Sequence, residues 1–143
     1  MGLNPHGLKD QYADYWQQNQ NHTLINYAYC VENPKKFKGY GPNTWGLTAS
    51  DSYEGYMAHN PKEDVGVISP TAALSAFPYT PEQSMQALKH FYFDLGDKMW
   101  GEHGFVDSFS KQHDWAAKSY LAIDRRLIVG MIENYRSGLL WRL

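Results

Sequence analysis

A stretch rich in glycine and proline, residues 35–67, restricts the fold of this 143-residue chain more than any other feature. The residues that interrupt a helical period within it are Gly39, Gly41, Pro42, Gly46, Gly55, Pro61 and Gly66. A connection of this length inside a compact domain is uncommon unless it carries function. We therefore look for a functional site in this loop, and we expect a short β-ribbon around residues 40–48.

Two helices are predicted before the loop. The first should end near residues 17–20 and is predicted from a four-residue apolar spacing, which is carried by Leu8, Tyr12 and Trp16. The second should begin near His22 and end before Pro34, because the residue before a proline is pushed out of the α region. We expect these two helices to form an antiparallel pair.

Two further helices are predicted after the loop, and a proline opens each of them. Ser69-Pro70 has the form of an N-cap followed by proline at the first helical position, and this helix should stop at Pro78. Thr80-Pro81 repeats the signal, and Gln83 completes a capping box with the threonine. The helix that follows should bury one stripe, made of Met85, Leu88, Tyr92, Leu95 and Met99.

The last helix is expected to run from about Asp124, as its candidate cap, to Ser137, with Gly138 as the residue that ends it. A second glycine-bounded loop, residues 101–114, and a short segment, residues 115–121, precede it. The sequence therefore predicts one all-α domain with about six helices arranged in pairs, joined by long loops.

Composition excludes several classes of function. The formal charge is only −2 and charged residues make up 20% of the chain, so nucleic acid and anionic lipid are not expected partners. No apolar run reaches the roughly 18 residues that span a bilayer, and residues 1–5 lack the features of a signal peptide. With Cys30 as the only cysteine and no histidine pair at metal-ligand spacing, we expect no disulfide, no metal site and no cofactor.

Aromatic residues make up 15% of the chain, which is high enough to suggest carbohydrate binding. Sugar rings present apolar C–H faces surrounded by hydroxyl groups, and Tyr and Trp suit both parts of that surface. The alternative is that these side chains fill a core and its boundary. Composition alone leaves both interpretations open.

Three long motifs match a known family. They are Trp45-Gly46-Leu47-Thr48-Ala49-Ser50-Asp51, Gly104-Phe105-Val106-Asp107-Ser108-Phe109 and Ile132-Glu133-Asn134-Tyr135-Arg136-Ser137-Gly138-Leu139-Leu140-Trp141. Together with residues 69–74 and 122–124, they resemble the C-terminal half of the glucoamylase-like family of glycoside hydrolases, which includes bacterial endo-β-1,2-glucanases. The resemblance extends over about residues 40–142.

The resemblance implies an (α/α)6 toroid with a sugar-binding cleft at its loop-rich end, and inverting hydrolysis of β-linked glucans. It also implies a periplasmic or secreted full-length protein, although the chain itself indicates no localisation. Twelve helices need roughly 200 residues at ordinary element lengths, so residues 1–143 are expected to be the C-terminal part of the toroid. One departure lies after Asp124, where the family has a Gln-Gly-Pro-like turn and this chain has Arg125-Arg126-Leu127.

Three carboxylates are candidates for the chemistry, because inversion needs an acid and a base about 6.5–9.5 Å apart. Asp51 lies in the long loop among aromatic residues, or it caps a turn. Asp107 alternates with two phenylalanines, where apolar walls would raise its pKa, or it binds its own backbone. Glu133 lies on an apolar helix, where it either serves a site or pairs with Arg136.

The sugar-facing candidates are aromatic residues of the two loops and of the segment after them, namely Trp45, Tyr53, Tyr56, Phe105 and Trp115. The predicted function is that of a fragment of a β-glucan hydrolase, inactive by itself because the general acid is expected in the missing N-terminal half. The partners would be an oligo- or polysaccharide and either that missing half or a second copy of the chain. The alternative is a non-catalytic carbohydrate-binding module or a structural helical module.

Overall fold

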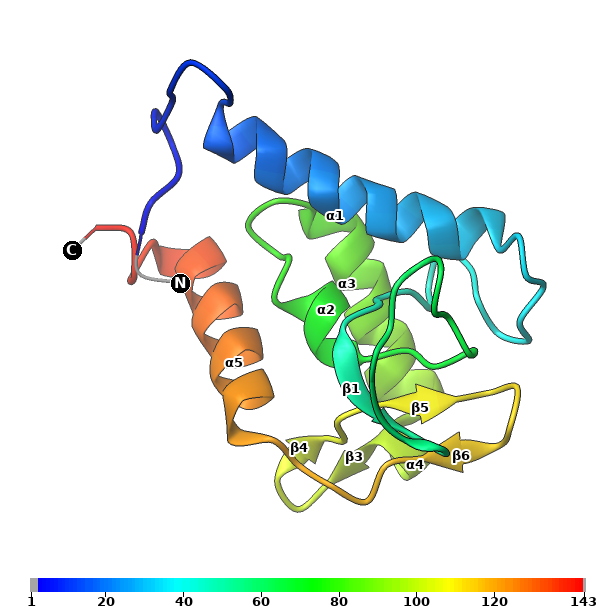
Figure 1. The fold of residues 1–143 in the computed structure, drawn as a ribbon. Coiled ribbons are helices and arrows are strands. Elements are labelled where there is room, and N and C mark those ends of the chain that lie inside the picture. The colour runs from blue at the N-terminus through cyan, green and yellow to red at the C-terminus, as the bar shows by residue number, and fades with distance from the viewer. Residues whose placement is uncertain (1–2, 143) are drawn as a thin grey trace.

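The computed structural model describes residues 3–142 and combines helices with short β-ribbons (Figure 1). The helices are α1 (Tyr15–Glu32), α2 (Pro70–Leu74), α3 (Pro81–Lys89), the π-helical turn η1 (His90–Asp94), α4 (Gly96–Met99) and α5 (Ala122–Ser137). The strands are β1 (Ala49–Ser52), β2 (Gly55–Ala58), β3 (Trp100–Gly101), β4 (Gly104–Phe105), β5 (Phe109–Ser110) and β6 (Trp115–Ala116).

The predicted all-α fold, a partial (α/α)6 toroid of paired helices, is wrong. Within residues 3–142 the strands form three two-stranded antiparallel sheets, β1-β2, β3-β4 and β5-β6. Two of these hairpins turn at glycines in the left-handed region, Gly55 at φ 115° and Gly104 at φ 97°. The glycines that interrupt the helical period therefore also permit tight turns. Strands within the same loop then pair as antiparallel hairpins.

The N-terminal region forms one helix in place of the predicted pair. The Asp14 carboxylate caps α1 by accepting the Gln17 N–H at 3.2 Å, and the helix then continues unbroken to Glu32. The predicted stop is confirmed, since Asn33 ends the helix at φ 45° directly before Pro34. Leu8 is 40% exposed in the segment before α1, so the apolar spacing there does not mark a helix.

The β-ribbon of the long loop lies later than predicted. Residues 49–58 form it, with Asp51 opposite Tyr56 and Ser52 opposite Gly55. The predicted region, residues 40–48, contains only an isolated bridge between Gly41 and Thr44. The reason is the core: Trp45 is completely buried and holds this part of the loop against α1 and α3.

The two proline-opened helices begin where predicted, at Pro70 and Pro81. The predicted capping box is wrong, because the Thr80 hydroxyl donates to the carbonyl oxygen of Ala76 at 3.5 Å and caps no helical N–H. The predicted buried stripe is correct in part: Met99 is buried and Leu88 and Leu95 pack against the core, but the face of α3 is rotated by about one residue. Met85 is 41% exposed, whereas Ala87 and the following Phe91 are buried.

The core lies between α1, the α2–α3 pair and the ribbons, and α5 packs against α2 (Figure 1). Its largest fully buried side chains include Trp45, Phe77, Phe91 and Ile68. The predicted end of α5 is confirmed, with Gly138 in the left-handed region at φ 71°. No helix among residues 3–142 is long and apolar enough to cross a membrane.

Candidate active site

Asp51 is held from three sides by residues distant in sequence. Its backbone N–H donates to Oδ2 of Asp107 at 2.7 Å, and its carbonyl oxygen accepts the Ser108 hydroxyl at 2.6 Å. Its side-chain Oδ2 accepts the Ser119 hydroxyl at 2.5 Å. The long loop, the segment after β4 and the segment before α5 therefore meet at this residue.

Asp107 lies beneath Asp51 and is almost completely buried, with 2% of its surface exposed. Its backbone N–H donates to the Ser119 carbonyl oxygen at 3.2 Å, which fixes its place in the ribbon region. Oδ1 of Asp107 is buried and has no hydrogen-bond partner among the described residues. The Asp107 side chain therefore holds the backbone of Asp51 in place and does not face solvent.

Asp124, in the first turn of α5, is the third carboxyl of the cluster. Burial raises its pKa to about 7, the neighbouring Asp107 carboxyl adds to the shift, and the Arg125 charge opposes it. A negative charge nearby makes ionisation of a buried carboxyl costly, so Asp124 keeps its proton up to near neutral pH. Such a carboxyl can take up or release a proton at the pH where an enzyme works.

Sequence reasoning did not select Asp124 for the site, because it was interpreted as the cap of the last helix. The structure assigns the cap position to Leu121, which leaves Asp124 within the helix. The available signal was its position in Ala122-Ile123-Asp124, one of the segments that carried the family resemblance. The guanidinium carbon of Arg125, the next residue, lies 4.9 Å from the centre of the Tyr120 ring.

His59 was also missed, and no sequence pattern indicated it. It is 4% exposed, and neither ring nitrogen has a hydrogen-bond partner among the described residues. Burial lowers its pKa, although the charges of Asp64 and Asp107 favour the protonated ring. Below the ribbon, Asp64 accepts the hydroxyl groups of Tyr40 at 2.7 Å and Tyr29 at 3.0 Å, and so fixes the loop.

Glu133 does not join the carboxyl cluster. It follows Asp124 by nine residues on α5, which corresponds to about 13 Å along a helix axis. Its Oε2 atom accepts Nη1 of Arg136 at 3.1 Å. The ion pair, which was one of the two interpretations from sequence, is the contact that the structure contains.

The aromatic residues predicted to face a sugar differ in their solvent exposure, and some of them belong to the core. Trp45 and Phe105 are buried, at 0% and 7% exposure, so both rings belong to the core. Tyr56 is 67% exposed and lies directly opposite Asp51, so the two side chains project from the same face of the ribbon. Tyr53 packs against the His113 ring with centroids 3.9 Å apart, and Trp115 is half-buried on the β5–β6 ribbon.

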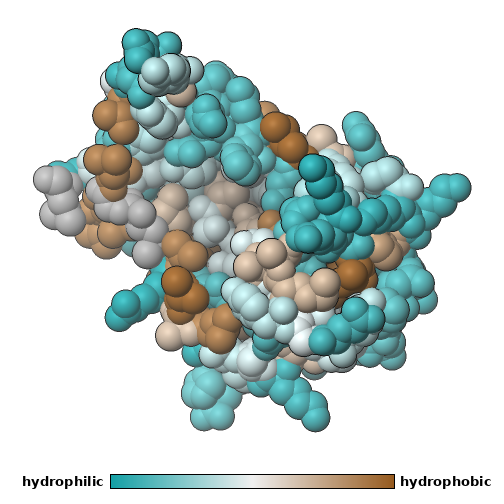
Figure 2. All heavy atoms as spheres, in the orientation of Figure 1, coloured by the Kyte–Doolittle hydropathy of each residue, from teal (hydrophilic) through white to brown (hydrophobic). Residues whose placement is uncertain are grey.

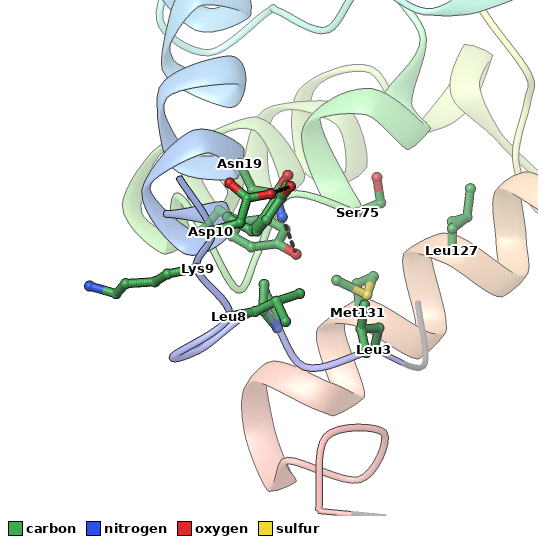
Figure 3. A pocket seen from close by; sticks show the side chains of 11 residues that line it. Leu3, Leu8, Lys9, Asp10, Asn19, Ser75, Leu127 and Met131 are labelled. Carbon is green, nitrogen blue, oxygen red and sulfur yellow. Dashed lines mark hydrogen bonds between the residues drawn. The ribbon is translucent and has the colours of Figure 1, made fainter. Parts of the chain in front are cut away.

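A hollow of about 770 Å³ lies away from these carboxyls. It is formed between the N-terminal segment, α1 and α5, and Leu8, Leu127 and Met131 reach into it (Figure 3). Its lining is mostly apolar and none of the three clustered aspartates contributes to it. The hollow therefore resembles a packing surface more than a site for acid and base chemistry.

Comparison with known proteins places the chain in a family. The model of the glycoamylase family, described as "Putative glucoamylase", matches residues 1–143. A crystal structure from Bacteroides uniformis with the same description is 60% identical, with a TM-score of 0.97, over 99% of this chain and 34% of that one. An endo-β-1,2-glucanase from Chitinophaga pinensis, solved with sophorotriose and glucose, is also 60% identical, with a TM-score of 0.95 and the same coverage.

A curated relative, the exo β-1,2-glucooligosaccharide sophorohydrolase of Parabacteroides distasonis, is 43% identical over the whole chain. The chain spans only 20% of that relative and 34% of the Chitinophaga glucanase, so it corresponds to part of longer proteins. The expectation of a partial family member is thereby confirmed. Since the family model covers every residue of the sequence, the chain belongs to the glycoamylase family.

Proposed function

We propose that the chain is the C-terminal part of a hydrolase of β-1,2-linked glucans, and that Asp51 is its substrate-contacting carboxylate. The observation that carries the proposal is the convergence of three segments on Asp51 through Asp107, Ser108 and Ser119. A carboxylate fixed in this way has lost the freedom that would otherwise oppose a defined catalytic geometry. The activities of the Chitinophaga and Parabacteroides relatives supply the substrate class.

Asp107 and Asp124 are proposed to position Asp51 and to determine the negative charge next to it. Asp107 binds the backbone N–H of Asp51, and the raised pKa of Asp124 limits the negative charge that gathers beside it. Asp51 is then the carboxylate that activates water, with the pair as its support. We therefore propose Asp51 as the general base.

Inversion requires a second carboxyl about 6.5–9.5 Å from the base. Asp107 is 2% exposed and its Oδ2 accepts the backbone N–H of Asp51, so it is not available to protonate a glycosidic oxygen. Glu133 lies over two helical turns from Asp124 and is paired with Arg136. The general acid is therefore proposed to come from the part of the protein outside this chain, and the isolated chain should be inactive.

Tyr56 is proposed as the sugar platform beside Asp51. The two residues are direct cross-strand neighbours, so their Cβ atoms lie about 4.5–5.5 Å apart on one face. The Tyr56 ring is 67% exposed, which leaves it available for the apolar face of a glucose unit. A carboxylate and an aromatic surface on one face provide both a hydrogen-bond acceptor and a stacking surface for the sugar.

The apolar hollow and its surroundings are proposed to receive the rest of the protein. Hydrophobic side chains gather where α5 and the N-terminal segment lie (Figure 2), and large ones there are exposed, including Leu3, Val129 and Leu139 at 72%, 66% and 56%. About two thirds of the length of the solved relatives lies outside the matched region. Contact with that region would remove this apolar area from water.

A chimera tests the proposal. The segment of the Chitinophaga glucanase that aligns with this chain is replaced by residues 1–143, and hydrolysis of β-1,2-glucan is followed by release of reducing ends. The chimera should be active, whereas the purified 143-residue chain alone should release no product. An inactive but folded chimera would contradict the proposed function, and turnover by the isolated chain would contradict the proposed source of the acid.

A further inference from the structure

A second cavity lies on the β5–β6 ribbon, outside the carboxyl cluster. Its volume is about 430 Å³, which is within the roughly 300–1,000 Å³ of small-molecule sites. Leu95, Met99 and Phe109 form an apolar floor, and none of Asp51, Asp107 and Asp124 lines the cavity. An apolar floor with a few polar groups above it is typical of a ligand pocket.

Trp115 provides an aromatic wall of this cavity. It lies directly opposite Ser110 in the ribbon, so the two side chains project from the same face. Ser110 is 2% exposed, and its hydroxyl accepts the His113 N–H at 3.3 Å, which helps to fix the turn between the strands. The half-buried indole therefore presents its ring from a fixed position.

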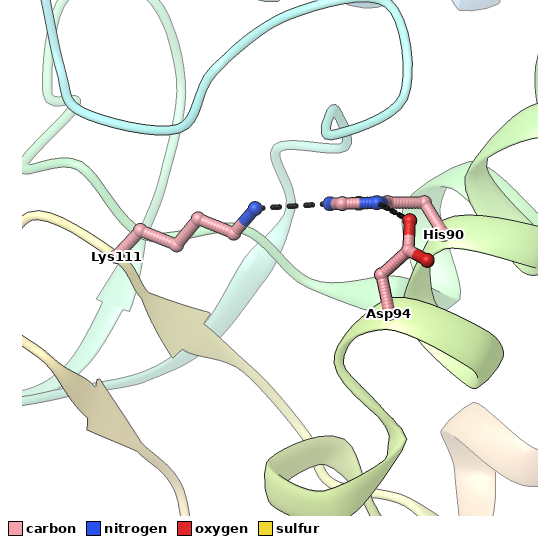
Figure 4. Close-up of polar contacts among 3 residues, drawn as sticks. All are labelled: His90, Asp94 and Lys111. Atoms are coloured by element: carbon pink, nitrogen blue, oxygen red, sulfur yellow. Dashed lines mark hydrogen bonds and ion pairs between the residues drawn. The ribbon is translucent and has the colours of Figure 1, made fainter.

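Lys111 provides a positioned donor at the edge of the cavity (Figure 4). Its Nζ atom lies 2.9 Å from Nε2 of His90, and Nδ1 of the same ring lies 2.6 Å from Oδ2 of Asp94. The neutral ring with its proton on Nδ1 donates to Asp94 and accepts from the ammonium. An ammonium has three N–H donors, and among residues 3–142 only His90 accepts one of them.

The backbone is shaped around the stem of Lys111. A Cβ atom at Gly39 would clash with Cδ of Lys111, and Gly39 has a φ of 94° that favours glycine. The next turn is tied to the same loop, because the Lys38 N–H donates to Oε1 of Gln112 at 2.9 Å. The lysine is therefore held in one position, with little freedom left to lose on binding a ligand.

The charges of the cavity favour a neutral, hydroxyl-rich ligand. Asp94, Asp97 and Asp114 contribute three negative charges and Lys98 and Lys111 two positive ones, so the lining carries a formal charge of −1. That balance disfavours an anion. Carboxylates accept from sugar hydroxyls, the ammonium donates to them, and an indole stacks on the apolar face of a pyranose.

We infer that this cavity is a second carbohydrate-binding site, which takes a glucose unit of a β-linked glucan against Trp115 and Lys111. The inference rests on the proposed function for the choice of sugar. The cavity is separate from the face that carries Asp51 and Tyr56. Its proposed role is also different, because it binds the sugar without breaking a bond.

Nuclear magnetic resonance of the 143-residue chain titrated with sophorotriose tests the inference. The indole N–H signal of Trp115 should shift and saturate. Trp115→Ala should weaken binding at this site at least tenfold, and Lys111→Met several-fold, while Lys118→Met, at an exposed lysine outside the cavity, should leave the affinity unchanged. Circular dichroism of each variant separates lost binding from lost folding, and the titration of the unaltered chain needs no variant.

Two results would overturn the inference. Saturable shifts confined to Tyr56 and its neighbours would exclude the second site and leave the proposed function intact. A Trp115 signal that does not move at saturating sugar would exclude the second site as well, and the activity of the chimera would then decide the proposed function independently.

Discussion

Asp107 accepts the backbone N–H of Asp51 at 2.7 Å, so a buried side chain from one loop fixes the backbone of another. Asp107→Asn retains an acceptor oxygen, whereas Asp107→Leu leaves the N–H without a partner, and both remove the charge. We predict that the leucine variant is less stable than the asparagine variant by about 1–3 kcal/mol, the usual cost of an unsatisfied buried group. Urea unfolding of the two variants measures the difference, and equal midpoints would show that the bond contributes nothing.

The pKa of Asp124 predicts a pH dependence of stability. Between about pH 4 and pH 7 the unfolded carboxyl has lost its proton and the folded one, with its pKa raised to about 7, retains it. The folded state then binds more protons, so the free energy of unfolding must fall as the pH rises through this window. Above about pH 7 this contribution stays constant.

The prediction is measured as the difference in unfolding free energy between the wild-type chain and Asp124→Asn, because other titrating groups cancel in that difference. The wild type should lose stability relative to the variant from pH 4 to pH 7. Asp107 and Arg125 are the charged groups that act on Asp124. A difference that stays flat over this range would mean that Asp124 is already ionised in the folded chain.

Gly46 is predicted to be intolerant of any side chain. Its φ is 125°, and a Cβ atom there would lie 2.8 Å from the carbonyl oxygen of Ser69, which is backbone and cannot rotate away. Gly55 has a similar φ of 115° with nothing within 4 Å, so it is a matched control for backbone strain. Gly46→Ala should cost about 1–3 kcal/mol more than Gly55→Ala, by the usual penalty for overpacking. Similar melting temperatures for the two variants would contradict this packing.

Local signals predicted the parts of the fold that local interactions determine. A proline at the first helical position marked the starts of α2 and α3, and Gly138 marked the end of α5. These features depend on the φ angles of single residues, which a sequence contains directly.

The ribbons and the single N-terminal helix depend on particular contacts that the hydrophobic periodicity of the sequence does not reveal. The register of β1 and β2 follows from the burial of Trp45 in the core and from the turn at Gly55, and the α1 start follows from one capping carboxylate, Asp14. Long-range packing therefore decided the position of the ribbon within a loop that glycine content had correctly marked as irregular.

The candidate site was predicted in part. Asp51 and Asp107 were selected from separate loops and lie in contact, and their catalytic roles remain proposals. Asp124 was not identified from the sequence, because an aspartate in the first turn usually serves the helix terminus. Only its interaction with Asp107 identifies it as a member of the cluster. His59 was not identified from the sequence, because a single histidine in a loop forms no recognisable motif.

The role of Asp51 is tested most directly by its replacement in the active chimera. Asp51→Asn keeps the shape and the Ser119 acceptor position but removes the charge needed to activate water. The account predicts a fall in kcat of roughly 10²–10⁴-fold, the range of general acid–base catalysis, while Glu102→Gln, at an exposed residue between β3 and β4, leaves kcat unchanged. An Asp51→Asn chimera with the kcat of the unsubstituted chimera would contradict the account.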